Sequence, residues 1–428
     1  MVEKTPPFSE KCAAPSGRSK PALALTILFI VAVVIRLAAG QWASGGLDRE
    51  LEADEPNYFI RAVNLVEGRG LADEEGRPSS ERTPGLPLLL ALLFSAFGPD
   101  ITLARVMMCI MGALLVPACY LLGESVAGRR AGSLCALAAV IFPNWVWYSS
   151  FLLTDIPSAV STVFLAWSLI EGYRRDSPRW FALAGVIGGI GVLIRPTGVV
   201  FLPGIIVWIL LAMRGRRRRF EASALLFVTF ACVLAPLAVR NTLVQGEFVP
   251  VSTKAGTELY IANNPGATGI LTYDFRLYSE ELSRIYPRSR YPNEARRSAM
   301  YRKDAERFIR ENPGRFLRLC LIRFVEFWKV YSPRVRLWQN LLTILSFGLA
   351  LPFALLHAVR CGWRRGPTML LIILIASQTA VNMVFTSIIR YRIPIEPLVI
   401  VLASAGLVWI YDRMRDRIPN LLSRTDPT

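Results

Sequence analysis

Long apolar stretches separated by short polar segments dominate the chain. They fall at residues 21–39, 101–122, 131–148, 156–170, 180–194, 199–213, 220–239, 337–359, 367–387 and 394–411. Most approach the roughly 20 residues that an α-helix needs to cross a bilayer, so the pattern predicts about ten transmembrane helices. The stretches at 180–194 and 199–213 are short and could form a tight hairpin, which leaves the helix boundaries between 180 and 213 open.

A further apolar stretch at 84–97 covers only about half of a bilayer. It predicts a helix that is either re-entrant or lies on the membrane surface, and the sequence does not choose between the two. Counting it as a transmembrane helix would place the arginine cluster at 214–219 outside the cell, against the rule that short cytoplasmic loops are rich in Lys and Arg. We therefore reject that topology.

Ten transmembrane helices divide the chain into five regions. These are a cytoplasmic head at 1–20, a transmembrane module at 21–240 that contains a first outer loop at 40–99, a large outer loop at 241–336, C-terminal transmembrane helices at 337–411 and a cytoplasmic tail at 412–428. Within the large outer loop, a helical pattern runs from about Asn293 to Lys329 and is broken at Pro313-Gly314.

Composition and charge support an all-α polytopic membrane protein. The 428 residues are 53% hydrophobic, and the formal net charge is +17. In the ten-helix topology the inner segments hold about 21 Lys and Arg, whereas the short outer loops hold about three. This distribution places both termini in the cytoplasm of a cell (inner or plasma) membrane protein, and it indicates contact with the lipid bilayer rather than with nucleic acid.

Several classes of chemistry are excluded. The seven cysteines are odd in number and scattered, so they indicate no disulfide framework. The single histidine, His357, is predicted near a cytoplasmic helix end, which excludes a histidine-based catalytic or metal site on the outer face. The chain has neither a Walker A nor a dinucleotide-binding glycine pattern.

Two acidic positions on the predicted outer face have two interpretations each. Asp54-Glu55 precedes an amphipathic helix that starts near Tyr58, and Asp155 lies between two transmembrane helices just before Ile156-Pro157. Both could simply cap a helix N-terminus. A carboxylate at the edge of the hydrocarbon is costly, however, and usually has a partner or a catalytic task.

Arginines also collect at predicted outer helix ends. They are Arg36, Arg105, Arg195, Arg240 and Arg390, with Arg82 at the same level in the first outer loop. Each alone could extend its guanidinium to the interface. Five on the side where arginine is disfavoured indicate a bound anion, and the planar guanidinium fork suits phosphate, as in an anionic phospholipid-like ligand.

The chain resembles the GT-C membrane glycosyltransferases that use polyprenyl-phosphate sugars, especially the protein O-mannosyltransferases and the lipid A aminoarabinose transferases (glycosyltransferase families 39 and 83). The resemblance rests on the order and outer-face placement of six short motifs. They are Asp54-Glu55-x-x-Tyr58, Arg82-Thr-Pro-Gly-Leu-Pro, Leu153-Thr-Asp155-Ile-Pro157, Leu193-Ile-Arg195-Pro-Thr-Gly198, Asn263-Asn264-Pro-Gly-Ala-Thr-Gly269 and Arg390-Tyr391-Arg392-Ile-Pro394.

The resemblance implies a GT-C bundle with juxtamembrane helices in the first outer loop and one larger outer loop. It implies that Asp54 is the catalytic carboxylate, that Glu55 supports it and that Asp155 is the second outer-loop acid. Glu81-Arg82 matches an acidic-basic pair whose basic member, a lysine in the aminoarabinose transferase, faces the donor phosphate.

Further positions follow from the same resemblance. The predicted donor-phosphate residues are Arg82, Arg390, Arg195, Arg105 and Tyr391, and the predicted substrate-loop residues are Tyr58, Glu81, Asn263 and Asn264. The histidine that helps to hold a metal in the aminoarabinose transferase has no counterpart here. No metal ligands or cofactor are therefore assigned, although the outer-loop acids could bind a divalent cation.

The predicted function is transfer of a sugar from a polyprenyl-phosphate donor to an acceptor hydroxyl at the outer membrane face. Asp54 would act as general base, arginines would stabilise the departing phosphate, and the anomeric configuration would invert. Two alternatives stay open: a flippase or other transporter of lipid-linked glycans, and an O-antigen-type ligase or polymerase. The sugar, the acceptor (a glycan, lipid or protein), any metal dependence and the oligomeric state are not determined.

Overall fold

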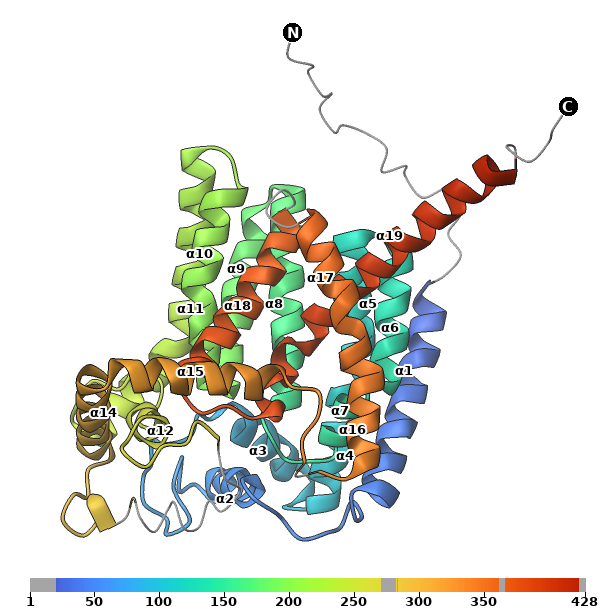
Figure 1. The fold of residues 1–428 in the computed structure, drawn as a ribbon. Coiled ribbons are helices and arrows are strands. Elements are labelled where there is room, and N and C mark those ends of the chain that lie inside the picture. The colour runs from blue at the N-terminus through green and yellow to red at the C-terminus, as the bar shows by residue number, and fades with distance from the viewer. Residues whose placement is uncertain (1–20, 271–281, 283, 334, 362–365, 423–428) are drawn as a thin grey trace, which may run out of the picture.

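The structure is a computed structural model that describes residues 21–270, 282, 284–333, 335–361 and 366–422. The regular secondary structure of this part of the chain is helical, with one isolated β-bridge between Ala72 and Pro78. The predicted cytoplasmic head and the last six residues of the predicted tail lie outside the described residues. Figure 1 shows long helices side by side in a bundle, with α2, α3 and α12 gathered at one end of it.

The helices follow one another along the chain, and the longest described connection without a helix lies between α2 and α3. They are α1 Pro21–Ala38, η1 Ala39–Ala43, α2 Glu55–Val66, α3 Gly85–Phe97, α4 Ile101–Ala113, α5 Leu115–Ala127, α6 Arg129–Ile141, α7 Pro143–Tyr148, α8 Asp155–Arg175, α9 Pro178–Ile194, η2 Pro196–Val200, α10 Phe201–Ala212, α11 Arg216–Gln245, α12 Lys254–Ala262, α14 Glu294–Glu311, α15 Pro313–Trp328, α16 Leu337–Thr343, η3 Ile344–Gly348, α17 Leu349–Cys361, α18 Gly366–Val384, η5 Ile389–Ile395 and α19 Glu396–Leu422.

Six helical segments of the described chain are long and apolar enough to cross a membrane. They are Ala22–Ala43, Ile101–Ala127, Arg216–Gln245, Leu337–Cys361, Gly366–Val384 and Ile389–Asp416. Shorter apolar helices add Gly85–Phe97, Pro178–Ile194 and Pro196–Ala212. The chain is therefore a multi-pass membrane protein. Each of the ten stretches predicted to cross the membrane falls on helix, but the number of crossings stays a prediction.

Prolines explain where several predicted elements divide. The stretch predicted at 131–148 forms two helices, because the chain turns extended at Phe142 before Pro143 starts α7. In the large outer loop, the predicted break is confirmed: α14 ends at Glu311 and α15 starts at Pro313. The stretch at 84–97 forms α3, a helix of 13 residues that packs against α2.

Helix ends from distant parts of the sequence converge at one level of the bundle. Helix α8 is largely buried and begins there at Asp155, whereas α9 ends there at Ile194 and α18 ends there at Val384. The short helix η5 follows directly before α19. In Figure 1, α1 begins and α19 ends at the opposite end of the bundle from α2, α3 and α12. The converging helix ends create the setting for a site.

Helices α9 and α11 pack closely through glycine. A Cβ added to Gly185 on α9 would overlap the side chain of Thr229 and the carbonyl oxygen of Leu226, both on α11. One turn further along α9, a Cβ on Gly188 would meet its nearest neighbour, the Phe230 ring, at 3.4 Å. Glycine at 185 thus lets the two backbones approach, as small residues do between membrane helices.

We expect Gly185→Ala to destabilise the bundle and Gly188→Ala to leave it nearly unchanged. The first methyl group must displace backbone, which costs roughly 1–3 kcal/mol in a close-packed core. The second occupies ordinary contact space and gains the helix preference of alanine over glycine. Thermal unfolding of the detergent-solubilised variants measures the difference, and equal midpoints for both would contradict this packing account.

Candidate active site

The carboxylate of Asp54 is held by two arginines from distant segments. Asp54 lies just before α2, and its Oδ1 accepts a hydrogen bond from Arg82 Nη2 at 2.7 Å. Its Oδ2 lies 3.4 Å from Arg390 Nη2. The side chain makes no capping hydrogen bond to α2, although Asp54 occupies the N-cap position. Of the two interpretations of this residue, the helix cap is therefore wrong.

Asp155 forms a second, deeper acid-arginine pair. It is the first residue of α8, and its side chain is only 2% exposed. Its Oδ1 accepts a hydrogen bond from Arg195 Nη1 at 2.8 Å, and its Oδ2 lies 3.6 Å from Arg390 Nε. The guanidinium of Arg390 thus lies between the two carboxylates and joins their pairs into one cluster.

Proline placement explains how the sequence brings these arginines to the helix ends. Arg195 directly precedes Pro196, and a residue before proline is driven out of the helical region. Its backbone is accordingly extended, with φ −141° and ψ 115°, and α9 ends at Ile194. Arg390 lies in the short helix η5, which contains Pro394 and precedes α19.

The cluster borders a cavity of about 400 Å³. Arg82, Arg195 and Arg390 line it, and the Nε group of each is buried without a hydrogen-bond partner among the described residues. The rings of Tyr58 and Tyr391 lie beside these guanidinium groups, with Arg195 4.9 Å from the centroid of Tyr391. The Nε groups of Arg36, Arg49 and Arg105, away from the cavity, lack a partner in the described chain too, so this feature does not by itself indicate a ligand. Three guanidinium groups gathered at one cavity nevertheless suit an anion.

Lys254 was missed by sequence reasoning. It begins α12, lines the cavity, and its Nζ lies 3.1 Å from Glu258 Oε1. Glu258 also accepts a hydrogen bond from the Thr386 hydroxyl at 3.2 Å, which connects α12 to the segment after α18. Nothing in the sequence distinguishes this lysine from other basic residues of the large outer loop, because its approach to the cavity depends on tertiary packing.

The positive charges keep the outer-loop acids ionised. Burial by itself opposes ionisation of Asp54, but the charges of Arg82, Lys254 and Arg390 outweigh it and hold the pKa of this carboxyl well below its usual range. Burial likewise opposes ionisation of Glu81, yet Lys254 and Arg82 lower its pKa. At neutral pH the cavity therefore presents carboxylates and cations side by side.

Comparisons with known proteins show a partial family match and a shared fold. Residues 81–239 match the model of a family described as dolichyl-phosphate-mannose-protein mannosyltransferase. The match covers a little over a third of the chain, so it is a similarity of this segment to that family. The matched segment contains Arg82, Asp155 and Arg195, whereas Asp54 and Arg390 lie outside it. No curated protein matches the chain.

Solved structures of GT-C enzymes share the fold. The oligosaccharyltransferase of Archaeoglobus fulgidus aligns with a TM-score of 0.60 and 15% identity over 94% of this chain and 52% of its own. ArnT from Cupriavidus metallidurans aligns in the apo state with a TM-score of 0.56 and 15% identity, over 91% of this chain and 60% of its own. The same enzyme bound to undecaprenyl phosphate gives a TM-score of 0.54 at 14% identity, over 90% of this chain and 60% of its own. The chain thus spans about half to three fifths of these proteins.

The structure gathers most of the sequence-predicted site residues around one cavity. Lining it are Asp54, Tyr58, Glu81, Arg82, Asp155, Arg195, Arg390 and Tyr391. Glu55, Arg105, Asn263 and Asn264 do not line it. Arg36 and Arg240, which sequence reasoning grouped with the anion-facing arginines, instead donate hydrogen bonds to backbone carbonyl groups such as those of Ala139 and Leu71.

Glu55 and Arg105 form a buried pair that shapes the first outer loop. Both side chains are fully buried, with Arg105 Nη2 3.1 Å from Glu55 Oε2. Glu55 Oε1 also accepts a hydrogen bond from the backbone N–H of Leu152, and Arg105 donates to carbonyl groups of the segment 47–50. The pair therefore fixes the chain beside Asp54. Arg105 is placed to hold the loop rather than to contact a phosphate in the cavity.

Asn263 and Asn264 play a similar part at the end of α12. The Asn263 amide donates to the carbonyl group of Val384, and its oxygen accepts from Arg323 Nη1 at 3.2 Å. Asn264 accepts from the backbone N–H of Gly266 at 2.7 Å, which closes the turn after the helix. These asparagines join α12, α15 and the end of α18 behind the cavity wall.

The described residues contain no group of three or more His, Cys, Asp and Glu side chains arranged to hold a metal ion. The acids of the first outer loop point to different partners. Asp54 pairs with Arg82 and Arg390, whereas Glu55 pairs with Arg105. The acids that sequence reasoning considered for a divalent cation are thus neutralised by arginine.

We expect Glu55→Gln to lower stability strongly. The substitution keeps the size of the side chain but leaves Arg105 charged and buried without its counter-charge, which costs roughly 3–5 kcal/mol in comparable buried pairs. The matched control is Glu221→Gln, whose partner Arg217 is exposed on α11; it should unfold like the parent. Thermal unfolding in detergent compares the two, and an unchanged midpoint for Glu55→Gln would refute the structural role.

Proposed function

We propose that this protein transfers a sugar from a polyprenyl-phosphate-linked donor to the hydroxyl group of an acceptor. The observation that carries the proposal is that the side chains of Arg82, Arg195 and Arg390 line one cavity together with Asp54. The family match and the shared GT-C fold support the same class of reaction.

The phosphate group of the donor would bind to the guanidinium groups of Arg82, Arg195 and Arg390. A polyprenyl-phosphate sugar carries one negative charge, and its leaving group, polyprenyl phosphate, carries a second as the sugar–oxygen bond breaks. Fixed cations placed where this charge develops stabilise the transition state more than the bound donor. Lys254 adds a further positive charge at the same cavity, although Glu258 partly neutralises it.

Asp54 would be the general base. Its carboxylate would take the proton of the acceptor hydroxyl while that oxygen bonds to the anomeric carbon, and the bond from this carbon to the phosphate oxygen would break. A single displacement of this kind inverts the anomeric configuration. Asp155 is too firmly buried against Arg195 to reach an acceptor, so we assign it the task of orienting Arg195 and Arg390.

Donor binding would also make Asp54 a better base. In the structure its negative charge is stabilised by Arg82 and Arg390, which favours the unprotonated form but makes it weakly basic. A phosphate that accepts hydrogen bonds from the same arginines would share their charge and raise the pKa of Asp54. Proton abstraction would then be favoured only when the donor is in place.

In the proposed topology, each of the ten apolar stretches crosses the membrane once. Both termini would lie in the cytoplasm, and the end of the bundle that holds α2, α3 and α12 would face outward. The donor's polyprenyl chain would enter between helices from the bilayer. The acceptor would be a glycan, a lipid or a protein.

Asp54→Asn should lower the transfer rate by roughly 10²–10⁴, the usual contribution of a general base. The measurement uses radiolabelled polyprenyl-phosphate sugar with the purified protein and membrane-derived acceptors, and it follows release of free polyprenyl phosphate. The matched control is Glu50→Gln, an exposed acid of the same loop. Full activity in a folded Asp54→Asn protein would overturn the assignment, and movement of intact donor across vesicles without cleavage would indicate a flippase.

Arg82→Gln should shift the acidic limb of the pH–rate profile to higher pH. The positive charge of Arg82 helps to lower the pKa of Asp54, so its removal raises that pKa, and the carboxylate form is lost at a higher pH as the solution is acidified. The profile of kcat/KM against pH measures the shift. The control Arg318→Gln removes an exposed arginine of α15 and should leave the limb in place. A limb unmoved in Arg82→Gln would contradict this electrostatic coupling.

A further inference from the structure

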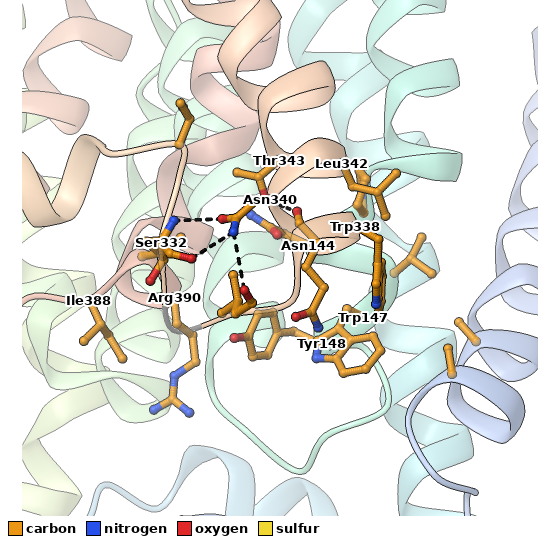
Figure 2. Close-up of a pocket in the computed structure, with 18 of the residues that line it drawn as sticks. Asn144, Trp147, Tyr148, Ser332, Trp338, Asn340, Leu342, Thr343, Ile388 and Arg390 are labelled. Carbon is orange, nitrogen blue, oxygen red and sulfur yellow. Dashed lines mark hydrogen bonds between the residues drawn. The ribbon is translucent and has the colours of Figure 1, made fainter. Parts of the chain in front are cut away.

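A second cavity, of about 390 Å³, lies beside the first. Its lining comes from the outer part of α1 with η1, from α7, from the segment that follows α15 and from α16 (Figure 2). Arg390 lines both cavities. In Figure 2 the guanidinium of Arg390 points away from Ser332 and Asn340, in keeping with its pairing to Asp54 and Asp155. The second cavity therefore approaches the proposed catalytic cluster from another side.

The second cavity differs from the first in charge. Its lining includes Lys329 and Glu326, which form an ion pair with each other. The nearby buried acid Glu396 is satisfied by Arg392, by the Trp145 indole N–H and by the Asn144 amide. Apart from Arg390, whose head group belongs to the first cavity, the described residues of the lining thus offer no uncompensated cation. The cavity suits an uncharged ligand rather than a phosphate.

Aromatic rings and amide groups supply its recognition chemistry. Trp147 and Trp338 meet edge to face, with ring centroids 6.1 Å apart, and Tyr148 lies next to them (Figure 2). Asn144 and Gln339 add side-chain amides. The Asn144 nitrogen already donates to Glu396 and the Gln339 oxygen already accepts from the Arg336 N–H, which leaves the Asn144 oxygen as an acceptor and the Gln339 nitrogen as a donor for a ligand. Flat aromatic faces beside groups that both donate and accept hydrogen bonds suit a molecule with apolar faces and several hydroxyls, such as a sugar.

The outer rim of this cavity is apolar and exposed. Ile141 is 65% exposed, Trp338 43% and Leu342 41%. Trp338 and Leu342 lie on Leu337–Cys361, a segment long and apolar enough to cross the membrane, so we expect their exposed surfaces to meet lipid chains. The π-helical turn η1 contributes Ala39 and Ala43 to the lining, and a second π-helical turn, η3, follows Thr343. Such turns often mark functional sites within helices.

We propose that the second cavity binds the acceptor, and that the acceptor is an uncharged hydroxyl-bearing head group, such as a sugar, carried on a lipid tail. The head group occupies the space between Trp147 and Asn144, its tail leaves over Ile141 and Leu342, and its reactive hydroxyl reaches Asp54 past Arg390. This assignment rests on the proposed function and deepens it by naming the acceptor class.

Binding is tested with a neutral amphipathic probe. The probe is an alkyl glycoside whose chain carries a photoreactive diazirine, added to the full chain in phospholipid vesicles, and the labelled peptides are mapped. Labelling is expected within residues 141–148 and 335–343. Val146→Trp, which fills the cavity, should reduce this labelling roughly tenfold, a typical effect of blocking a pocket. The matched control Val239→Trp adds the same ring at an exposed position of α11 and should label like the parent.

A second variant guards against misfolding. Trp338→Leu removes the exposed ring but keeps an apolar side chain, and it should also weaken labelling while its thermal unfolding matches that of the parent. Labelling of Val146→Trp and Trp338→Leu at the level of the parent would overturn the assignment.

A binding experiment with polyprenyl phosphate tests whether the second cavity holds the acceptor or the lipid tail of the donor. Binding of polyprenyl phosphate to Val146→Trp should match binding to the parent, and polyprenyl phosphate should not displace the alkyl glycoside. Loss of polyprenyl phosphate binding in Val146→Trp, or full competition, would show that the cavity holds the donor's tail and would overturn the inference. A parent protein that never cleaves the labelled donor would instead refute the proposed function, whatever the labelling shows.

Discussion

The guanidinium of Arg390 connects parts of the protein that are far apart in sequence. It lies 3.4 Å from Asp54 in the first outer loop and 3.6 Å from Asp155 at the start of α8, and it belongs to the short helix before α19. Buried charges are costly unless they are paired. Separating the three segments would leave a charge buried without its partner, and this cost holds them together. The two cavities, which share Arg390, depend on that arrangement.

The protein uses buried arginine in two distinct ways. Arg36, Arg105 and Arg323 donate most of their N–H groups to backbone carbonyl groups or to an acid and so hold helices and loops in place. The arginines of the first cavity are also paired, but their Nε groups at the cavity have no acceptor within the described chain. The Nε groups of Arg36 and Arg105 also lack an acceptor there, so position rather than hydrogen-bond count separates the two sets. Only the second set lines the cavity, where an anion could reach the guanidinium groups.

The two cavities differ in the charge of their lining residues, and this difference suits a transfer reaction between two substrates. The first concentrates cations beside carboxylates, and the second combines aromatic rings with amides and a compensated ion pair. Two substrates of different charge would meet at Arg390 without competing for the same contacts. The firm anchoring of the first outer loop through Glu55 and Arg105 keeps Asp54 near that meeting point.

The sequence by itself determined the helical membrane class, the break before Pro313 and most of the charged residues around the first cavity. Hydrophobic run length follows bilayer thickness, and proline acts locally, so both can be read along the chain. The tertiary structure decided which charges meet. Arg105 and Arg195 look alike in sequence, since each lies near an apolar helix end, yet one binds Glu55 and backbone carbonyl groups and the other borders the cavity. Lys254 and the second cavity were invisible for the same reason: Lys254 lies beside Asp54, Arg82 and Arg390, and the second cavity is lined by four segments that are far apart along the chain. No local pattern records such contacts.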